Sequence, residues 1–295
     1  MHRALQGGRN RSWRQGIGLV LAGLMAFAAL PAMGASLAAC QRVPLVDADT
    51  GAPVIGAEDM VLDRAAGRLY LAAYDRWALE DALAANAETL PQGAIYAAPL
   101  DAVTARPERL ALTPAATGDG QDFHPHGLSL HHGPAGTWMT AINHRHVRAD
   151  SAWSRETRIA RFRITPKGLV AEGLGAERGA AHPRLCQANN LAALTPRDLL
   201  VTRDHGRCGR FGRLLEDVLG LRAAEVTLAT LDGPKTERGT QGETDSAARV
   251  TPLAADLGFA NGIALSPDGR RVAVAATREK AVRIYDVADL LGADA

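Results

Sequence analysis

The sequence predicts an all-β fold of the β-propeller type, because one hairpin pattern recurs along it. In each copy a polar residue opens an apolar, alternating strand, a tight turn follows, and a second strand runs back. The opening residues are Glu58, His126, Asn189 and Asn261, so the copies are 68, 63 and 72 residues apart. A hairpin unit that returns at a nearly constant period is the signature of radially repeated sheets.

In a propeller, the innermost strand of every blade begins near one end of the central channel. The four opening residues are therefore expected to converge there, although they are far apart in the sequence. Carboxylate and amide oxygens gathered at one place are ligands for a hard cation such as Ca²⁺. The pattern thus predicts a cation site at one end of the propeller.

The other elements follow from composition and periodicity. The hairpin strands are expected at residues 60–62 with 69–72, 128–130 with 138–142, 191–194 with 199–202, and 262–265 with 271–276. Further strands are expected at 157–164, where polar and apolar residues alternate, and at 281–287. Helix-forming composition predicts short helices within 77–90 and around 212–221.

Length and charge limit the protein class. With 295 residues, 47% of them apolar, the chain can bury a large core and is expected to form one propeller domain over residues 40–295. The 33 basic and 32 acidic residues leave a net charge of +1. No overall field therefore favours nucleic acid or an acidic partner.

Residues 1–39 are expected to be a signal peptide or a membrane anchor. Arginines precede an apolar run at 17–30, which at about 14 residues is shorter than the ~20 that a spanning helix needs. Leu37-Ala38-Ala39-Cys40 matches the bacterial lipobox, in which the cysteine carries a lipid anchor. Ordinary cleavage near Ala35 or Ala39, or an uncleaved anchor, is the alternative. The protein is expected to be exported, as a periplasmic, membrane-anchored or secreted form.

The two other cysteines are expected to pair. Cys186 and Cys208 are equidistant from Arg197, which lies in the turn 195–198, so a regular hairpin would place them opposite each other. Export would permit the disulfide. The alternative is two unpaired thiols whose register is shifted by bulges. No Cys-x-x-Cys pair is present to indicate zinc-finger or thioredoxin-type chemistry.

Six short motifs surround the opening residues of the hairpins. They are Gly56-Ala57-Glu58-Asp59, Pro125-His126-Gly127-Leu128-Ser129, Ile142-Asn143-His144, Asn189-Asn190-Leu191, Asp204-His205, and Phe259-Ala260-Asn261-Gly262-Ile263 with Ser266-Pro267-Asp268-Gly269. In this order they resemble the motifs of the paraoxonase/arylesterase family, which is related to senescence-marker and gluconolactonase propellers. The resemblance covers Cys40 to about Val287. It implies a six-bladed β-propeller, two calcium ions in the central tunnel, and hydrolysis of lactones and aryl esters.

The resemblance also implies metal ligands. Glu58, Asn189 and Asn261 match ligands of the catalytic calcium. Asp59 and the backbone carbonyl of Leu128 match the deeper, structural calcium site. Asn190 stands where the family usually has an aspartate ligand of that second ion, so the structural site should be weaker.

The implied chemistry is ester hydrolysis. Ca²⁺ would polarise the ester carbonyl, while a histidine takes a proton from the attacking water. His126 matches the proposed general base, His144 its partner, and Phe259 a wall of the substrate pocket. No Gly-x-Ser-x-Gly or His-Glu-x-x-His motif offers another hydrolase mechanism.

Several alternatives stay open at this stage. The asparagines could only cap turns at strand starts. The stretch that contains His124, His126, His131, His132, His144 and His146 could indicate zinc. Strand spacing sends alternate histidines to opposite faces, however, so most are expected to face solvent. At the level of function, the alternative is a non-catalytic propeller that binds a small molecule or a protein.

The family pattern is not complete in this chain. The family supplies an adjacent Asp-Asn pair of calcium ligands after the Asn-Gly-Ile motif and closes the ring with further blades. Only 34 residues follow Asn261, and they do not contain that pair. The sequence is therefore expected to hold about four blades of a six-bladed propeller and to be incomplete at its C-terminal end.

Overall fold

The computed structural model describes residues 42–105, 107–117, 122–166, 168–171, 179–231 and 248–292. The expected export segment 1–39 and the expected lipid-anchor residue Cys40 lie outside these ranges. Within them, no helix combines the length and the hydropathy needed to cross a membrane.

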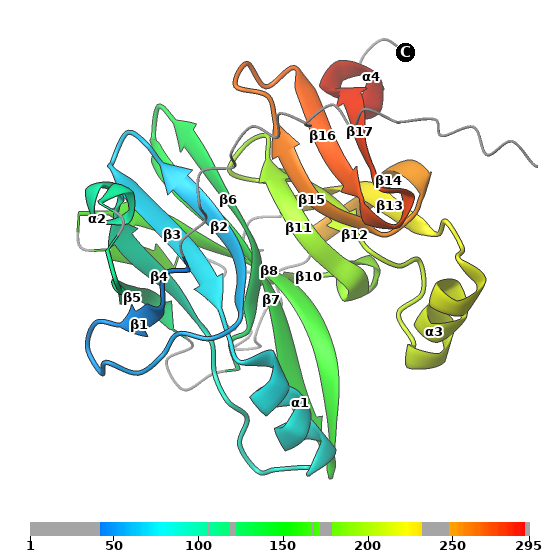
Figure 1. Ribbon diagram of the computed structural model, residues 1–295. Coiled ribbons are helices and arrows are strands. Elements are labelled where there is room, and N and C mark those ends of the chain that lie inside the picture. Colours follow the sequence, from blue (N-terminus) through cyan, green and yellow to red (C-terminus); the bar gives the residue numbers. More distant parts are fainter. Residues whose placement is uncertain are drawn as a thin grey trace, which may run out of the picture. The chain divides into compact units, whose positions relative to one another are not determined.

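The described chain forms four sheets, each opened by one of the expected hairpins (Figure 1). The first contains β1 (Leu45–Asp47), β2 (Ala57–Asp63), β3 (Arg68–Ala73), β4 (Ala94–Pro99) and β5 (Leu110–Thr117). The second contains β6 (Pro125–Gly133), β7 (Gly136–Ala149), β8 (Ala152–Thr165), β9 (Gly168–Ala171) and β10 (Ala180–Ala181). The third contains β11 (Ala188–Ala193), β12 (Asp198–Arg203), β13 (Ala224–Leu231) and β14 (Ala248–Leu257), and the fourth β15 (Ala260–Leu265), β16 (Arg271–Ala276) and β17 (Ala281–Asp286).

This is a four-blade β-propeller arrangement, which agrees with the expected number of about four blades. The six-bladed closure implied by the family resemblance is not confirmed. The strands within each blade are antiparallel meanders, apart from β1, which pairs in parallel with β5. The innermost strands β2, β6, β11 and β15 lie side by side in chain order, β2 against β6, β6 against β11, and β11 against β15 (Figure 1).

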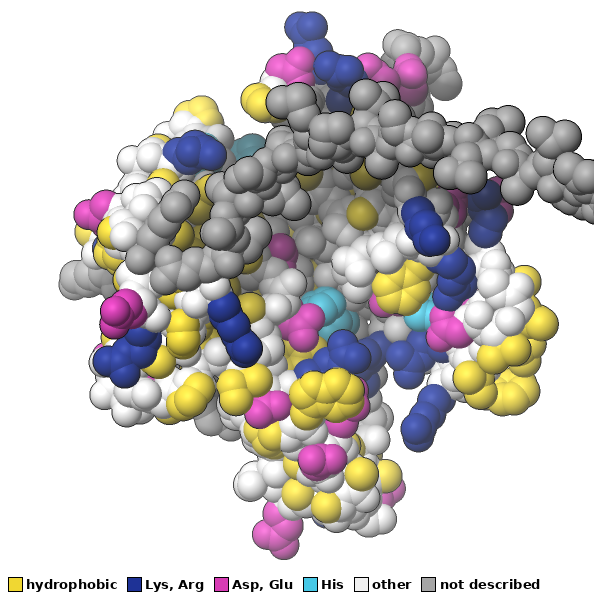
Figure 2. All heavy atoms as spheres, viewed as in Figure 1, with side chains coloured by type: hydrophobic (Ala, Val, Ile, Leu, Met, Phe, Trp, Pro, Cys, Tyr) yellow, Lys and Arg dark blue, Asp and Glu magenta, His cyan; other side chains and the backbone are white. Residues whose placement is uncertain are grey.

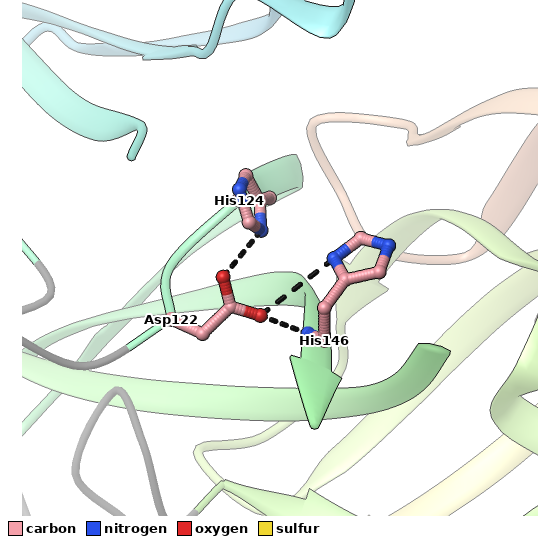
Figure 3. A group of neighbouring side chains, drawn as sticks. All are labelled: Asp122, His124 and His146. Carbon is pink, nitrogen blue, oxygen red and sulfur yellow. Dashed lines mark hydrogen bonds and ion pairs between the residues drawn. The ribbon is translucent and has the colours of Figure 1, made fainter. Parts of the chain in front are cut away.

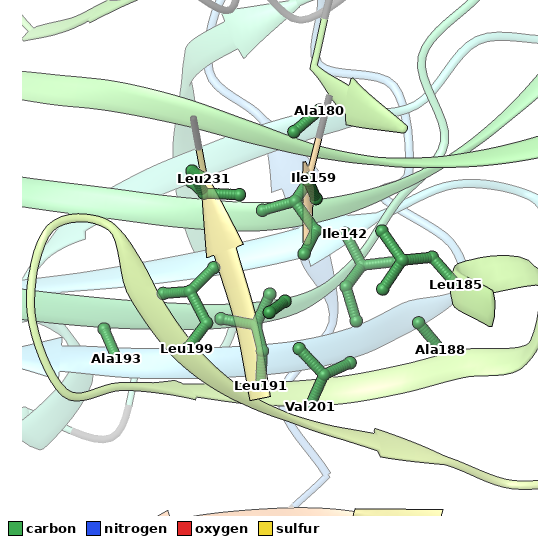
Figure 4. Close-up of a cluster of buried hydrophobic side chains, with 12 residues drawn as sticks. Ile142, Ile159, Ala180, Leu185, Ala188, Leu191, Ala193, Leu199, Val201 and Leu231 are labelled. Atoms are coloured by element: carbon green, nitrogen blue, oxygen red, sulfur yellow. The ribbon is translucent and has the colours of Figure 1, made fainter. Parts of the chain in front are cut away.

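Three apolar cores join neighbouring blades. Between the first and second blades, the fully buried Phe123, Ile95 and Met139 belong to one cluster. The core between the second and third blades joins residues of β7 and β8, such as Ile142 and Ile159, to residues of the next sheet (Figure 4). A third cluster joins the third and fourth blades. Each large aliphatic side chain buried in this way contributes about 1.5–3 kcal/mol, so the blades hold one another through these faces.

The described residues also form four α-helices and two 3-10 turns, namely α1 (Arg76–Ala84), α2 (Leu100–Thr104), α3 (Arg210–Leu219), α4 (Val287–Leu291), η1 (Pro183–Gln187) and η2 (Thr277–Glu279). The expected helices correspond to α1 and α3. The Asp75 side chain caps α1 by accepting a hydrogen bond from the Ala78 N–H. Leu79 of α1 then packs with Tyr74 and Leu90 against the second blade. Burial raises the pKa of Tyr74 to about 12.

The expected disulfide is present between Cys186 and Cys208, whose Cα atoms are 5.6 Å apart. The β11–β12 ladder is centred on Pro196 rather than Arg197, shifts its register at Asn189, and ends at Ala188 opposite Arg203. The two cysteines therefore lie just beyond the ladder, Cys186 in η1 and Cys208 before α3. The bridge ties the start of the third blade to the loop that leads into α3.

We predict that replacing both cysteines by serine lowers the free energy of unfolding by about 3 kcal/mol, because the 22-residue loop is no longer closed in the unfolded chain. Urea denaturation of the oxidised wild type and of the Cys186→Ser/Cys208→Ser variant measures this difference. The reduced wild type is the matched control and should behave like the variant. Equal midpoints for the oxidised and reduced chains would contradict a stabilising role for the bridge.

Candidate functional site

Each innermost strand carries one extra residue at the same place. The register of β2 against β3 shifts at Glu58, and that of β11 against β12 shifts at Asn189. In β6 the shift falls at His126 and Gly127, and in β15 at Asn261 and Gly262. A β-bulge leaves its extra residue outside the ladder and re-aims its side chain. All four opening residues of the sequence pattern thus lie at bulges.

The four bulges lie at one level, because contacts link each to the next. Glu58 Oε2 is 3.0 Å from His126 Nδ1. A side chain at Gly127 would touch the backbone of Asn189 and Asn190, so β6 and β11 approach closely there. The structure thereby brings Glu58, His126 and the adjacent Asn189 and Asn190 together from three blades.

The third and fourth blades meet through one hydroxyl group. Thr202 Oγ1 lies 2.5 Å from the carbonyl oxygen of Asn261 and 3.2 Å from that of Asn190. Thr202 Oγ1 also accepts a hydrogen bond from the Asn190 N–H at 3.0 Å. The backbone of the Asn261 bulge is therefore fixed against the third blade.

Glu58 and His126 each have 17% of their side-chain surface exposed, and Asn189 and Asn261 are partly exposed as well. The His144 ring lies behind His126, with 5.0 Å between the ring centroids. His126 Nδ1 is buried and makes no hydrogen bond among the described residues, and the Glu58 carboxylate is its charged neighbour. The arrangement is an imidazole beside a carboxylate, both within reach of solvent.

His144 is held neutral. Burial lowers its pKa well below the ordinary value, and the neighbouring charge of Arg155 acts in the same direction. Its Nδ1 lies 3.1 Å from the hydroxyl of Thr157. Arg155 itself is fixed by the carbonyl of Cys186 at 2.8 Å and by Gln187 Oε1 at 3.0 Å. His144 can therefore position His126, but it does not carry charge near neutral pH.

The residues matched to the second calcium site are linked by hydrogen bonds. Asp59 Oδ2 accepts from the Leu128 N–H at 2.8 Å, and Asp59 Oδ1 accepts from the Met60 N–H at 2.8 Å. Burial raises the pKa of Asp59, against the lowering effect of these bonds and of the Asn190 side chain. Asp59, Leu128 and Asn190 thus lie together, and Asp59 is engaged as an acceptor between two blades.

On the other side of Asn189, a second polar chain leads away from the bulges. Asn189 Nδ2 is 3.4 Å from Asp204 Oδ2, and Asp204 Oδ1 is 2.8 Å from His205 Nδ1. The Phe259 ring packs edge-on against His205, with 5.3 Å between the centroids. Phe259 therefore lies beside this chain, and Asp204 adds a carboxylate to which the sequence reasoning assigned no role.

A surface groove of about 570 Å³ adjoins this chain and is lined by His205 and residues of α3, including Phe211 and Asp217. Its lining residue His205 is connected to the bulge residue Asn189 through Asp204. On the face drawn in Figure 2, histidine and acidic side chains gather near the centre with basic side chains beside them. The exposed apolar side chains of α3, such as Phe211 and Val218, border the groove.

The expectation that most histidines of the His-rich stretch face solvent is wrong. His124, His144 and His146 are buried, with 0%, 7% and 8% of their surface exposed. On one face of β7, Met139 and Ala141 belong to the core shared with the first blade, and on the other face Ile142 belongs to the core shared with the third, so both faces are enclosed. His132, at 50% side-chain exposure, does face solvent.

Among the described residues, the group of three His, Cys, Asp or Glu side chains that could hold a metal is Asp122, His124 and His146. Glu58 is not part of such a group. A cation at the bulges would therefore need amide and backbone oxygens as ligands in addition to the Glu58 carboxylate. The identity of any metal is not fixed by these positions.

Comparisons with known proteins give distant likenesses. No protein-family model and no curated protein matches the chain. Hydrazine synthase of Kuenenia stuttgartiensis is 13% identical over 82% of this chain and 55% of its own, with a TM-score of 0.39. TolB from Acinetobacter baumannii is 12% identical, covers 83% of this chain and 41% of its own, and has a TM-score of 0.36. The periplasmic gluconolactonase of Pseudomonas aeruginosa is 13% identical, covers 77% of this chain and 65% of its own, and has a TM-score of 0.27. The chain spans about half the length of the first two, and no activity follows from these likenesses.

We predict that Gly127→Ala lowers the free energy of unfolding by about 1–3 kcal/mol. Its Cβ would lie 2.7 Å from Asn190 Cα and 2.9 Å from the Asn189 carbonyl oxygen, which are backbone atoms of the next blade. Gly262→Ala is the matched control, because it occupies the same bulge position in β15 and its Cβ would meet no atom within 4 Å. Chemical denaturation of both variants checks the difference. Equal stability would show that β6 and β11 do not depend on this close approach.

Proposed function

We propose that this protein is a calcium-dependent hydrolase of carboxylic esters, of the arylesterase or lactonase type. The observation that supports it best is the repeated bulge, which groups a carboxylate, an imidazole and amide side chains from separate blades. The partly exposed pair of Glu58 and His126 supplies the two groups needed to bind a cation and to accept a proton.

The donor chemistry of the group fits a hard cation. Calcium takes six to eight oxygen ligands at about 2.3–2.6 Å and accepts carboxylate, amide and water oxygens together. The pair with His126 uses one carboxylate oxygen of Glu58, which leaves the other for a cation. The Asn189 amide turns its nitrogen toward Asp204, so its oxygen is directed elsewhere. We propose Glu58, Asn189 and Asn261 as ligands, with water in the remaining positions.

We propose a second calcium site at Asp59, Asn190 and the Leu128 carbonyl. Asp59, Asn190 and Leu128 lie together, but the Asp59 carboxylate already accepts two backbone hydrogen bonds, one of them from the Leu128 N–H. A cation there would have to share it with those donors. Because Asn190 adds no negative charge, the site would bind calcium less tightly than the site at Glu58.

The residues of the chain divide the chemistry between them. When bound, calcium supplies a Lewis acid that polarises the ester carbonyl. His126 accepts the proton of the attacking water. His144 stays neutral and packs against His126, so it positions the base without competing for the proton. Phe259 beside His205 offers an apolar surface to the acyl or aryl part of the substrate.

We predict that the chain hydrolyses phenyl acetate or a γ- or δ-lactone, and that His126→Gln lowers kcat by about 10²–10⁴-fold because the proton acceptor is lost. Glu58→Gln should lower the rate more than His144→Gln, since Glu58 holds the electrophile while His144 only positions the base. Glu80→Gln, an exposed carboxylate of α1, is the matched control and should leave the rate unchanged. A wild-type chain that binds lactones without turnover would instead favour a non-catalytic binding propeller.

We predict that calcium raises the melting temperature of the wild type, because an ion that binds the folded state alone adds about 2.7 kcal/mol at 100 times its Kd. Glu58→Gln should remove most of the rise, and Glu80→Gln should retain it. Thermal unfolding in excess calcium and in chelator provides the measurement. The same midpoint in both solutions would rule out the proposed ligands together.

A further inference from the structure

A second cluster of ligand-type side chains lies beside the bulge of β6, just before that strand begins. Asp122 and His124 precede β6, and His146 lies on β7 (Figure 3). One ligand atom of each lies within 4.8 Å of the others. His124 Nδ1 is 3.3 Å from Asp122 Oδ1, and His146 Nδ1 is 3.6 Å from Asp122 Oδ2.

The contacts of His124 fix which ring nitrogen is free to bind. Nε2 lies 2.8 Å from the carbonyl oxygen of Pro91, which can only accept, so Nε2 carries the proton. The His124 ring is fully buried. Its Nδ1 faces two more acceptors, Asp122 Oδ1 at 3.3 Å and the His144 carbonyl at 3.2 Å. A positive charge at Nδ1, whether a bound metal ion or a second ring proton, would be stabilised by these oxygens.

His146 supplies the second, independent observation. Its side chain is more than nine-tenths buried, with 8% exposed, and its Nδ1 makes no hydrogen bond within the described part of the chain. Figure 3 shows this nitrogen directed at the Asp122 carboxylate. At 3.6 Å the separation is too long for a hydrogen bond. A buried ring nitrogen with nothing to bind, aimed at a carboxylate, is placed as a ligand.

We propose that Asp122, His124 and His146 bind one divalent transition-metal ion of the zinc class. Two imidazoles and one carboxylate form a set that zinc accepts, leaving a fourth position for water. Bonds of about 2.1 Å in a tetrahedral site place ligand atoms about 3.4 Å apart. The separations of 3.3 and 3.6 Å are measured to different oxygens of Asp122, and one ligand atom of each of the three residues lies within 4.8 Å of the others. Calcium would prefer an all-oxygen set, so this site differs in kind from the bulges.

Outer contacts hold the three ligands in place. The Asn143 side chain accepts a hydrogen bond from the His124 N–H at 2.8 Å and donates one to the Asp122 carbonyl at 3.1 Å. Asp122 also accepts from the His146 N–H, and Gln92 Nε2 lies 3.4 Å from Asp122 Oδ1. Partners of this kind orient metal ligands and fix the tautomer of a ligating histidine.

Because of where the site lies, the proposed ion would hold neighbouring strands in position. His124 lies two residues before His126 of β6, and His146 lies two residues after His144 of β7. The His144 N–H donates to the His124 carbonyl at 3.1 Å. An ion shared by His124 and His146 would fasten β6 to β7 next to the His126–His144 pair. It would not touch the substrate.

Zinc titration of the untagged full chain against a chromophoric chelator, in excess calcium, tests the site. We expect one equivalent of zinc to bind, and Asp122→Asn and His146→Gln each to weaken binding by about 100-fold or more. His132→Gln, at an exposed histidine of the same blade, is the matched control and should bind like the wild type. Glu58→Gln should also retain zinc, which separates this site from the calcium proposal.

Substitution with Co²⁺ supplies an independent readout, because a four-coordinate ion with nitrogen ligands gives strong visible absorption that His146→Gln should remove. Far-ultraviolet circular dichroism checks that each variant is folded. If Asp122→Asn does not fold, His146→Gln alone decides, since His146 Nδ1 has no hydrogen bond to lose. Absence of zinc binding, zinc binding unchanged in His146→Gln, or equal loss in His132→Gln would overturn the proposal.

Discussion

The repeated bulge at the start of the innermost strands is the constraint on which the candidate site depends. Side chains of a strand alternate between its two faces, so a regular strand would send the opening residue to the face set by its apolar neighbours. One extra residue interrupts this alternation of side chains between the two faces. The rest of each strand can then bury its apolar face against the next blade, while Glu58, His126, Asn189 and Asn261 leave the ladder.

Close packing of the inner strands turns these four separate bulges into one group. Gly127 has no side chain, and that lets β6 lie against the backbone of Asn189 and Asn190. Thr202 bridges the carbonyls of Asn190 and Asn261. The same packing removes water, which raises the pKa of Asp59 and keeps His144 neutral. Geometry and electrostatics of the site thus have one origin, the approach of strands from neighbouring blades.

Much of the fold could be predicted from local signals. The four hairpins, the strands of β8 and β17, and the helices α1 and α3 follow from periodicity and turn residues. The expected Cys186–Cys208 bridge is present, but the two cysteines meet beyond the ladder and not through its register. The bulges could not be found in this way, because one extra residue in a short strand does not change its composition. The parallel pairing of β1 with β5 depends on contacts between distant segments. The number of blades in a closed ring was inferred from the resemblance alone, and it is not confirmed.

The histidines show most clearly where alternation fails as a guide. It predicts that one face of a strand is wet, but Met139 and Ala141 on one face of β7 and Ile142, His144 and His146 on the other are all buried. A buried ring nitrogen needs a polar partner. His144 has the Thr157 hydroxyl at its Nδ1, whereas His146 Nδ1 has no hydrogen-bond partner among the described residues. Two rings two residues apart on one strand thus have different surroundings. In the proposed sites, the unpaired nitrogen of His146 would bind a cation together with Asp122 and His124, whereas His144 would position the proposed base at the bulge.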